Sequence, residues 1–326
     1  MFIGFGLQFK PLKSVMNKHY VERAYQEFDK KIKNEPLRKF ALYTFEKVPI
    51  PFPAYFFGLG GVGYHSIEGV GSFLNGEILS KTVWYYPLAA FFYKTQVSLL
   101  FIFIISLIFF KKTRSKNLFN EYVQILPMAA IFIIFMLNKM TAGLRHILPI
   151  YPFLFVFCSK IVKPEKKWLK ITLVILSAHY IISSLLVFPN YLAYFNEFTG
   201  GPANGYKHLV GANLDLGQDL PGLKRYMEKN NIDKVNLSYF GSIDPKEYVN
   251  YDYLPSPYFQ QWVPDFVRYV TVTERDEDCS EKKGWVAISV TNLQNVRMVN
   301  KTCFDWLKNY HPVAKIGYSI FIYNLS

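Results

Sequence analysis

The chain has little cysteine and comparatively little acid. Only three of its 326 residues are cysteines, too few for a disulfide-built scaffold or a Cys₄ zinc site. Lys and Arg number 37 against 24 acidic residues. The excess lies before residue 190, where the formal charge is +14, whereas the remainder carries −1. A nucleic-acid-binding protein would gather its cations on a soluble face, so the nearly neutral second part excludes that class of partner.

Motifs for several common catalytic chemistries are also missing. The sequence holds no metal-ligand spacing, no nucleophile elbow and no Ser/His/Asp arrangement. Its densest glycine run, around Gly58 and Gly63, does not lie between a strand and the Lys-Ser/Thr helix start of a phosphate loop. We therefore expect no metal site, and no cofactor is evident from these residues.

Long hydrophobic runs, in contrast, are abundant. Hydrophobic residues make up 51% of the chain and aromatic residues 18%. Four runs bounded by basic clusters or aromatic belts approach the ~20 residues that a membrane-spanning helix needs. They cover residues 88–110, 122–137, 144–162 and 168–187. The second is short and contains Pro127, which predicts a tilted, kinked or shielded helix. The sequence thus predicts an α-helical polytopic membrane region of about four transmembrane helices over residues 88–189.

Basic loops predict how these helices are oriented. The loops after the first and third runs are rich in lysine, whereas the turn at 138–143 holds only Lys139. The cations of the two loops are Lys111, Lys112, Arg114 and Lys116, and Lys160, Lys163, Lys166, Lys167 and Lys170. Short basic loops stay in the cytoplasm. We expect a multi-pass protein of the cell membrane with both long flanks extracytoplasmic, and with the lipid bilayer and phosphate-bearing lipids as partners.

The flanks divide into three segments. Residues 1–47 begin with an apolar stretch that looks like the end of a truncated helix, followed by a polar extracytoplasmic segment with a helical pattern at 21–33. Residues 48–87 are aromatic and glycine-rich, which predicts interfacial helices ending in an aromatic belt of Trp84, Tyr85 and Tyr86. Residues 190–326 predict a small extracytoplasmic α/β domain. Its expected helices cover 220–230 and 304–310, and its expected strands 234–240, 285–290 and 316–323.

The three cysteines and His179 have different expected roles. Cys158 falls inside the third apolar run, where inert packing is expected. Cys279 and Cys303 lie in the domain expected outside, where they form a disulfide or remain two free thiols. His179 is expected to be a satisfied helix residue rather than a ligand.

Cations that are expected near the ends of membrane helices, where a charge is unfavourable without a partner, are candidate site residues. Lys94 lies near the outer end of the first run, and Arg145 and His146 begin the third run at the same expected level. Together they predict a cradle for the phosphate of a lipid carrier, although snorkelling alone would also explain Lys94.

A second candidate group is polar. Asn213, Asp215, Gln218 and Asp219 place hydrogen-bonding side chains within seven residues. They could bind a sugar or an acceptor, or could cap the helix expected at 220, and capping is the favoured reading.

Several strings resemble the carboxy-terminal half of polytopic lipid-carrier-dependent glycosyltransferases. The family is glycosyltransferase family 39, dolichyl-phosphate-mannose protein mannosyltransferases, in its prokaryotic branch. The strings occur in order along most of the chain after residue 49. They are GEILSKTVWYYPLAAFFYKT (76–95), GLRHILPIYPFLFV (143–156), YFNEFTGGPANGYKHLVGANLDLGQDLPGL (194–223), LSYFGSIDP (237–245), GWVAISVTNLQNV (284–296) and PVAKIGYSIFIYNL (312–325).

The resemblance implies inverting transfer of a sugar from a polyprenyl-phosphate donor to an extracytoplasmic acceptor, with a divalent cation optional. It also implies a general base, an acid in the first extracytoplasmic loop, that this chain does not contain, so no catalytic residue is assigned here. Glu68 and His65 are expected to contact donor or substrate. Leu216 stands where the family commonly has Trp, and leucine lacks the aromatic area that would stack on a sugar or a neighbouring loop.

Three functions therefore remain open at this point. The chain is part of a membrane glycosyltransferase, inactive alone and dependent on a missing amino-terminal half or partner subunit. Alternatively it is a non-catalytic membrane subunit with an outer recognition domain. A weaker alternative is a transporter of lipid-linked sugars, which should show paired repeats that the sequence lacks.

Overall fold

The structure is a computed structural model that describes residues 9–16, 18–68, 71–80, 83–138, 143–164, 166–241, 243–256, 278–296 and 298–325. The side chains of residues 18–20, 23 and 61–68 lie outside this description. The described residues divide into two compact units, the first ending at Glu68 and the second beginning at Gly71. The expected interfacial segment 48–87 is therefore split between the two.

The first unit is a small helical assembly. β1 (Phe9–Pro11) pairs antiparallel with β2 (Pro49–Pro51), and η2 (Leu12–Val15), α1 (Lys18–Lys31), α2 (Glu35–Lys47) and α3 (Pro53–Glu68) complete it. Asn34 caps α2 by accepting a hydrogen bond from the Leu37 amide at 3.1 Å, and Phe45 is buried against Tyr25 and Phe28. The expected helix at 21–33 is thus present as α1.

α2 is less polar on its outer side than the sequence prediction for residues 10–47 implied. Leu37, Phe40 and Tyr43 are all more than half exposed. They recur three residues apart, so they share one face of the helix while Phe45 packs on α1. The segment is therefore amphipathic, with an apolar face that the first unit does not cover.

The second unit contains the long apolar helices. They are α4 (Tyr86–Lys94), α5 (Val97–Ile108), α6 (Phe110–Thr113), α7 (Phe119–Leu137), α8 (Leu144–Ile147), α9 (Ile150–Ser159) with η3 (Lys160–Val162), and α10 (Lys167–Leu186). Among the residues the structure describes, α7 and α10 are long and apolar enough to cross a membrane, and α4 with α5 makes a third candidate if a bent pair counts as one span. The other apolar helix, 150–162, is shorter. Membrane-length helices are therefore present, but a four-span region is not confirmed.

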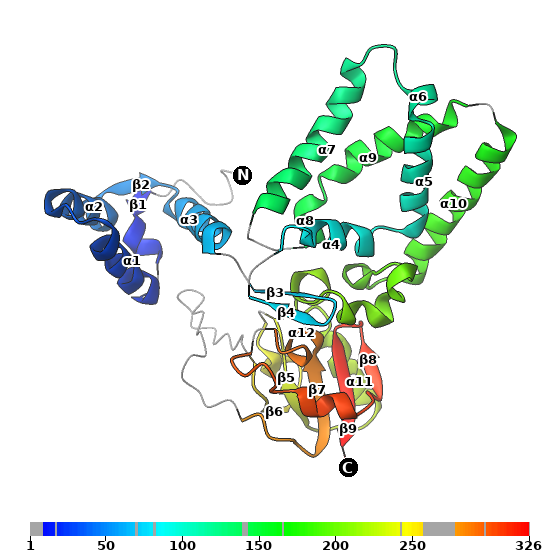
Figure 1. The fold of residues 1–326 in the computed structure, drawn as a ribbon. Helices are drawn as coiled ribbons and strands as arrows, with labels where there is room; N and C mark the ends of the chain where they lie inside the picture. Colours follow the sequence, from blue (N-terminus) through cyan, green and yellow to red (C-terminus); the bar gives the residue numbers. More distant parts are fainter. Residues whose placement is uncertain are drawn as a thin grey trace. The chain divides into compact units, whose positions relative to one another are not determined.

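The first expected span is broken because its two halves have different environments. The chain bends by 111° between α4 and α5, and Figure 1 shows α4 and α8 between the long helices and the sheet. Asn196 occupies carbonyls at the end of α4 from outside the helix. Its side chain donates to Phe92 O and to the oxygen of Thr95, the residue after α4, and its amide donates to Tyr93 O. Because those carbonyls are satisfied without another helical turn, the helix ends at Lys94.

The two basic loops lie together at the end of the helices away from the sheet (Figure 1). The Lys160 ammonium is 2.5 Å from the Glu121 carboxylate, and Lys163 donates to Thr113 O at 3.4 Å. This common position agrees with the expected alternation of the helices.

The carboxy-terminal part of the second unit is a mixed five-stranded sheet of order β6-β5-β7-β9-β8. Its strands are β5 (Val235–Ser238), β6 (Tyr251–Tyr253), β7 (Gly284–Ser289), β8 (Ala314–Ile316) and β9 (Ile320–Leu325), and its helices include α11 (Leu220–Lys229), α12 (Val290–Leu293) and η9 (Asp305–Asn309). β5 is parallel to both β6 and β7, whereas β9 is antiparallel to β7 and β8. The expected α/β character is present, although the single strand expected at 316–323 is two strands joined by a turn.

The two faces of the sheet have separate cores. α11 covers one face through Leu220, Leu223 and Met227. The other face packs against the segment 193–214 and against α4, whose Tyr86 and Ala90 belong to the same buried cluster. The short helices of that segment are η4 (Tyr191–Ala193), η5 (Glu197–Thr199), η6 (Pro202–Lys207) and η7 (Gly211–Asn213). The amino-terminal half of the first expected span is thus part of the domain core.

A hairpin just before α4 is attached to the same segment. In β3 (Ser72–Leu74) and β4 (Glu77–Leu79), the turn residue Asn75 donates its amide to His208 O at 3.0 Å. Its side chain accepts from His208 Nδ1 at 2.8 Å and donates to the Tyr93 hydroxyl at 2.9 Å. Trp84 and Tyr85 are exposed as an aromatic belt would be, but Tyr86 is buried, which corrects the expectation for that residue.

Candidate functional site

The candidate site is the joint between the membrane helices and the sheet domain. Lys94, the last residue of α4, is only 8% exposed. Its ammonium donates to Leu192 O at 2.7 Å and to Asn213 O at 2.5 Å, and it lies 4.4 Å from the centre of the Phe195 ring. Two carbonyl oxygens and an aromatic ring of the protein itself therefore stabilise the buried ammonium of Lys94.

Asn213 completes the joint from the other side. Its Oδ1 accepts from the Leu144 amide at 3.0 Å and its Nδ2 donates to the Tyr86 hydroxyl at 3.0 Å. Gly143, at φ +68°, makes this approach possible, because a Cβ there would lie 1.8 Å from Asn213 Oδ1. One side chain therefore connects the start of α4, the start of α8 and η7.

The cations expected to form a phosphate cradle are not brought together by a contact. In the described ranges, no hydrogen bond or ion pair joins Lys94 to Arg145 or His146. Arg145 is exposed, whereas His146 is half-buried and stacks on Phe135 at 5.0 Å. Lys94 does not snorkel but binds the domain, so Arg145 is the cation of the three whose side chain is open to an anion.

Asp215 is fully buried and has protein partners on both oxygens. Oδ1 accepts from the Gly217 amide at 3.1 Å, and Oδ2 accepts from the Thr291 hydroxyl at 3.2 Å. Thr291 in turn accepts from the Gly211 amide at 3.0 Å. Burial raises the pKa of the Asp215 carboxyl to about 7, against hydrogen bonds that lower it. This carboxyl holds the loop before α11 on α12.

Asp219 and Gln218 lie beside it. Asp219 makes no side-chain cap to α11, so the expected capping role is absent. Its Oδ2 instead accepts from the Ser319 hydroxyl at 2.6 Å and from Gln218 at 3.1 Å, and burial raises its pKa. Gln218 also bonds the Leu214 oxygen and the Leu216 amide. Leu216 and Gln218 are the exposed residues of this loop.

Glu197 is a polar site residue that the sequence interpretation missed. Its carboxylate accepts from Ser183 of α10 at 3.3 Å and lies 3.6 Å from His179 Nε2, and it is half exposed. Ser183 also lies 3.4 Å from the Tyr194 hydroxyl. His179 and Ser183 are four residues apart on α10, which is the spacing that places both on one helix face. The spacing of His179 and Ser183 could be recognised in the sequence, but their partner Glu197 could not.

The other candidate residues from the sequence are Glu68, His65 and Cys158. Glu68 and His65 belong to α3 of the first unit, and their side chains lie outside the described residues. Cys158 is free and buried. In the part of the chain that the structure describes, no group of three or more His, Cys, Asp or Glu side chains could hold a metal ion.

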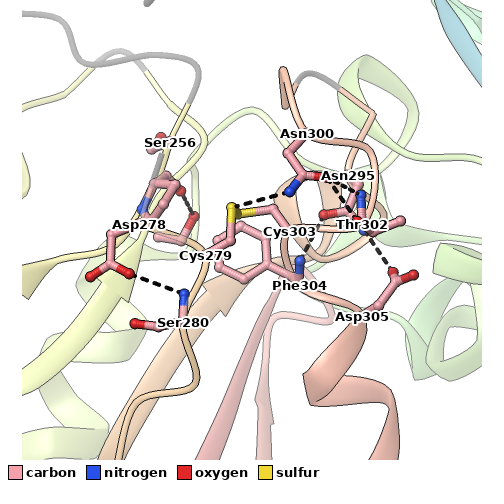
Figure 2. Close-up of a disulfide and its surroundings, with 12 residues drawn as sticks. Ser256, Asp278, Cys279, Ser280, Asn295, Asn300, Thr302, Cys303, Phe304 and Asp305 are labelled. Carbon is pink, nitrogen blue, oxygen red and sulfur yellow. Dashed lines mark hydrogen bonds between the residues drawn. A yellow bond between two sulfur atoms is a disulfide. The ribbon is translucent and has the colours of Figure 1, made fainter. Parts of the chain in front are cut away.

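Cys279 and Cys303 form a disulfide. Figure 2 shows it beside the turn that carries Asn300 and Thr302. Asn300 Nδ2 lies 3.8 Å from Cys279 Sγ, and Asn295 accepts from the Phe304 amide at 3.0 Å. The bridge fastens the segment entering β7 to the buried residues before η9.

The buried carboxyl of Asp215 predicts a pH effect. Its pKa is raised above that of an unfolded aspartate, so between about pH 4 and pH 7 the unfolded state is ionised while the folded state still holds the proton. Stability should therefore fall as pH rises through this window. Asp215→Asn keeps an acceptor for Gly217 but cannot titrate, so it should remove most of that fall. Thermal unfolding from pH 4 to pH 8 measures it.

The matched control for this test is Asp233→Asn, which changes an exposed acid of the same domain. It should keep the wild-type slope of stability against pH. An unchanged slope in Asp215→Asn would show that this carboxyl is not the group responsible.

Comparison of the chain with protein-family models, curated proteins and solved structures returns no match.

Proposed function

We propose that this chain is part of a membrane glycosyltransferase that moves a sugar from a polyprenyl-phosphate donor to an acceptor outside the cell membrane. The motif resemblance suggests this activity, and the joint around Lys94 and Asn213 is the structural observation that supports it most. Transfer from a lipid to a water-soluble acceptor needs a polar domain held at fixed height over the ends of membrane helices. A domain that shares its core with α4 meets that need.

In this proposal, the sheet domain and the joint lie on the extracytoplasmic side. The disulfide supports that side, because such bonds persist in oxidising compartments. The basic loops at the opposite end of the helices support it independently through their expected retention in the cytoplasm. The general base is proposed to come from an amino-terminal part or partner subunit, as the resemblance implies.

Arg145 is the proposed contact for the donor phosphate. It is exposed at the start of α8, next to the joint, and a guanidinium can bind phosphate through two parallel hydrogen bonds. Glu197 is proposed to accept a hydrogen bond from a hydroxyl group of the sugar or the acceptor, because its carboxylate is half exposed and is oriented by Ser183.

The test is transfer of a radiolabelled sugar in proteoliposomes that contain this chain together with the polypeptide encoded directly upstream. Arg145→Gln should raise the KM for the lipid donor about tenfold, the loss of one phosphate contact worth about 1.4 kcal/mol. Arg225→Gln, which removes an exposed arginine on α11, should leave that KM within twofold. An unchanged donor KM in Arg145→Gln removes this residue from the site.

A non-catalytic subunit is the second candidate, and one observation favours it. Lys94, Asn213, Asp215 and Asp219 all have protein partners, so the polar residues nearest the joint already stabilise the fold. If no donor supports transfer in the presence of the upstream polypeptide, but that polypeptide loses activity or stability when this chain is removed, the subunit function replaces the enzymatic one.

A further inference from the structure

The two basic loops form one surface whose only described acid is already neutralised. Glu121 is 3% exposed and Lys160 13%, and their charged atoms are 2.5 Å apart. The other oxygen of Glu121 accepts from the Ser115 amide at 2.6 Å. Together with the Lys163 bond to Thr113 O, these contacts fix the loop after α6 to the loop after η3.

The remaining cations of this surface are exposed and have no ion-pair partner in the residues that the structure describes. Segments 110–121 and 160–170 together contain nine Lys and Arg and two acids. The second acid, Glu165, lies outside the described residues. The exposed cations other than Lys163 are Lys111, Lys112, Arg114, Lys116, Lys166, Lys167 and Lys170.

Phe109 brings one lysine from each loop to a common point. The Lys112 ammonium lies 5.9 Å and the Lys166 ammonium 5.6 Å from the centre of the Phe109 ring. The two charges are therefore no more than about 12 Å apart, as both lie within about 6 Å of one ring. Trp168, half exposed, packs on the same ring at 6.0 Å. An aromatic pair next to exposed lysines at the end of long apolar helices is the arrangement expected at a lipid headgroup.

We propose that this surface, with Lys112, Lys166, Phe109 and Trp168 at its centre, binds an anionic phospholipid whose headgroup carries two phosphates. Each loop supplies a lysine to one phosphate, and the aromatic pair contacts the glycerol and upper acyl region. Basic pockets between transmembrane helices select such headgroups because several cations meet more than one phosphate at once. The site is distinct from the proposed donor contact at Arg145, which lies at the other end of the helices, and it does not depend on the proposed function.

The test uses the full chain in neutral detergent and measures bound lipid by native mass spectrometry. The probes are cardiolipin, with two phosphates, phosphatidylglycerol, with one, and phosphatidylcholine, which is zwitterionic. Cardiolipin should bind at least about tenfold more tightly than phosphatidylglycerol, and phosphatidylcholine should not compete. Equal affinity for cardiolipin and phosphatidylglycerol would contradict a two-phosphate site.

A charge-matched pair of variants separates a site from general attraction. K112Q/K166Q should weaken cardiolipin binding about 30-fold, the effect of two surface lysines. K111Q/K170Q removes the same charge from the same two loops and should weaken it less than threefold. K112R/K166R should retain binding, which shows that the loops still fold around the site. Equal losses in the two glutamine pairs, or loss in the arginine pair, would overturn the proposal.

Discussion

Replacing Lys94 with methionine should lower the free energy of unfolding by about 3 kcal/mol, because two buried carbonyl groups lose a charged donor. Methionine fills a similar volume beside Phe195 but cannot donate to Leu192 O or Asn213 O. The joint should open first, since those two bonds hold the end of α4 against the domain. Denaturant unfolding in detergent measures the loss, and amide hydrogen exchange at Thr95 and Asn196 locates it.

The control for this prediction is Lys229→Met, which removes an exposed lysine at the end of α11. It should change stability by less than about 0.5 kcal/mol, as surface substitutions usually do. If Lys94→Met were as stable as this control, the ammonium would not be the group that connects the helices to the domain.

Removing the disulfide should have an effect of similar size. Cys279 and Cys303 are 24 residues apart, and closing a loop of that length is worth about 3.5 kcal/mol through the entropy of the unfolded chain. The double variant Cys279→Ser/Cys303→Ser should lose about that much stability, and wild-type protein in dithiothreitol should behave in the same way. Reductant-dependent thermal unfolding gives both values.

Cys158→Ala provides the comparison, because it removes the buried free thiol and leaves the bridge intact. This variant should remain as sensitive to dithiothreitol as the wild type, whereas the double serine variant should be insensitive. Sensitivity that persisted in the double variant would assign the effect of reductant to another part of the molecule.

Local patterns along the sequence were sufficient for much of the fold. The apolar lengths of α7 and α10, the amphipathic pattern of α11 and the β-rich runs of β5 and β7 each occur within one segment. Hydrophobic periodicity reports such elements directly, because each buries one face or lies wholly in an apolar environment. The strand β6 has only three residues, which is too short to give a periodic signal.

The breaks depended on distant residues and could not be predicted in this way. α4 ends because Asn196, about a hundred positions later, occupies its carbonyls. β8 and β9 are separated by Gly317 and Tyr318, both with positive φ. A Cβ on Gly317 would lie 2.0 Å from the Asp219 carboxyl. The glycine is therefore needed where the turn passes Asp219, and that close approach exists only in the folded chain.

The site residues show the same limit. A cation near a membrane boundary correctly drew attention to Lys94, but its partners are backbone carbonyls that no side-chain motif encodes. Glu197 acquires its position from Ser183 and His179 on α10. The position of a charge in the sequence therefore identified Lys94 as a residue that needs a partner, whereas only the structure identified that partner.

We propose that the sheet domain and the joint around Lys94 lie outside the membrane, with the basic loops inside. Single cysteines at Asn117 in the first basic loop and at Lys246 in the domain, both exposed, test this in intact cells with a membrane-impermeant maleimide in a Cys158→Ala background. We expect labelling of Lys246→Cys in intact cells, and of Asn117→Cys only after lysis. Labelling of Asn117→Cys but not Lys246→Cys before lysis would contradict it.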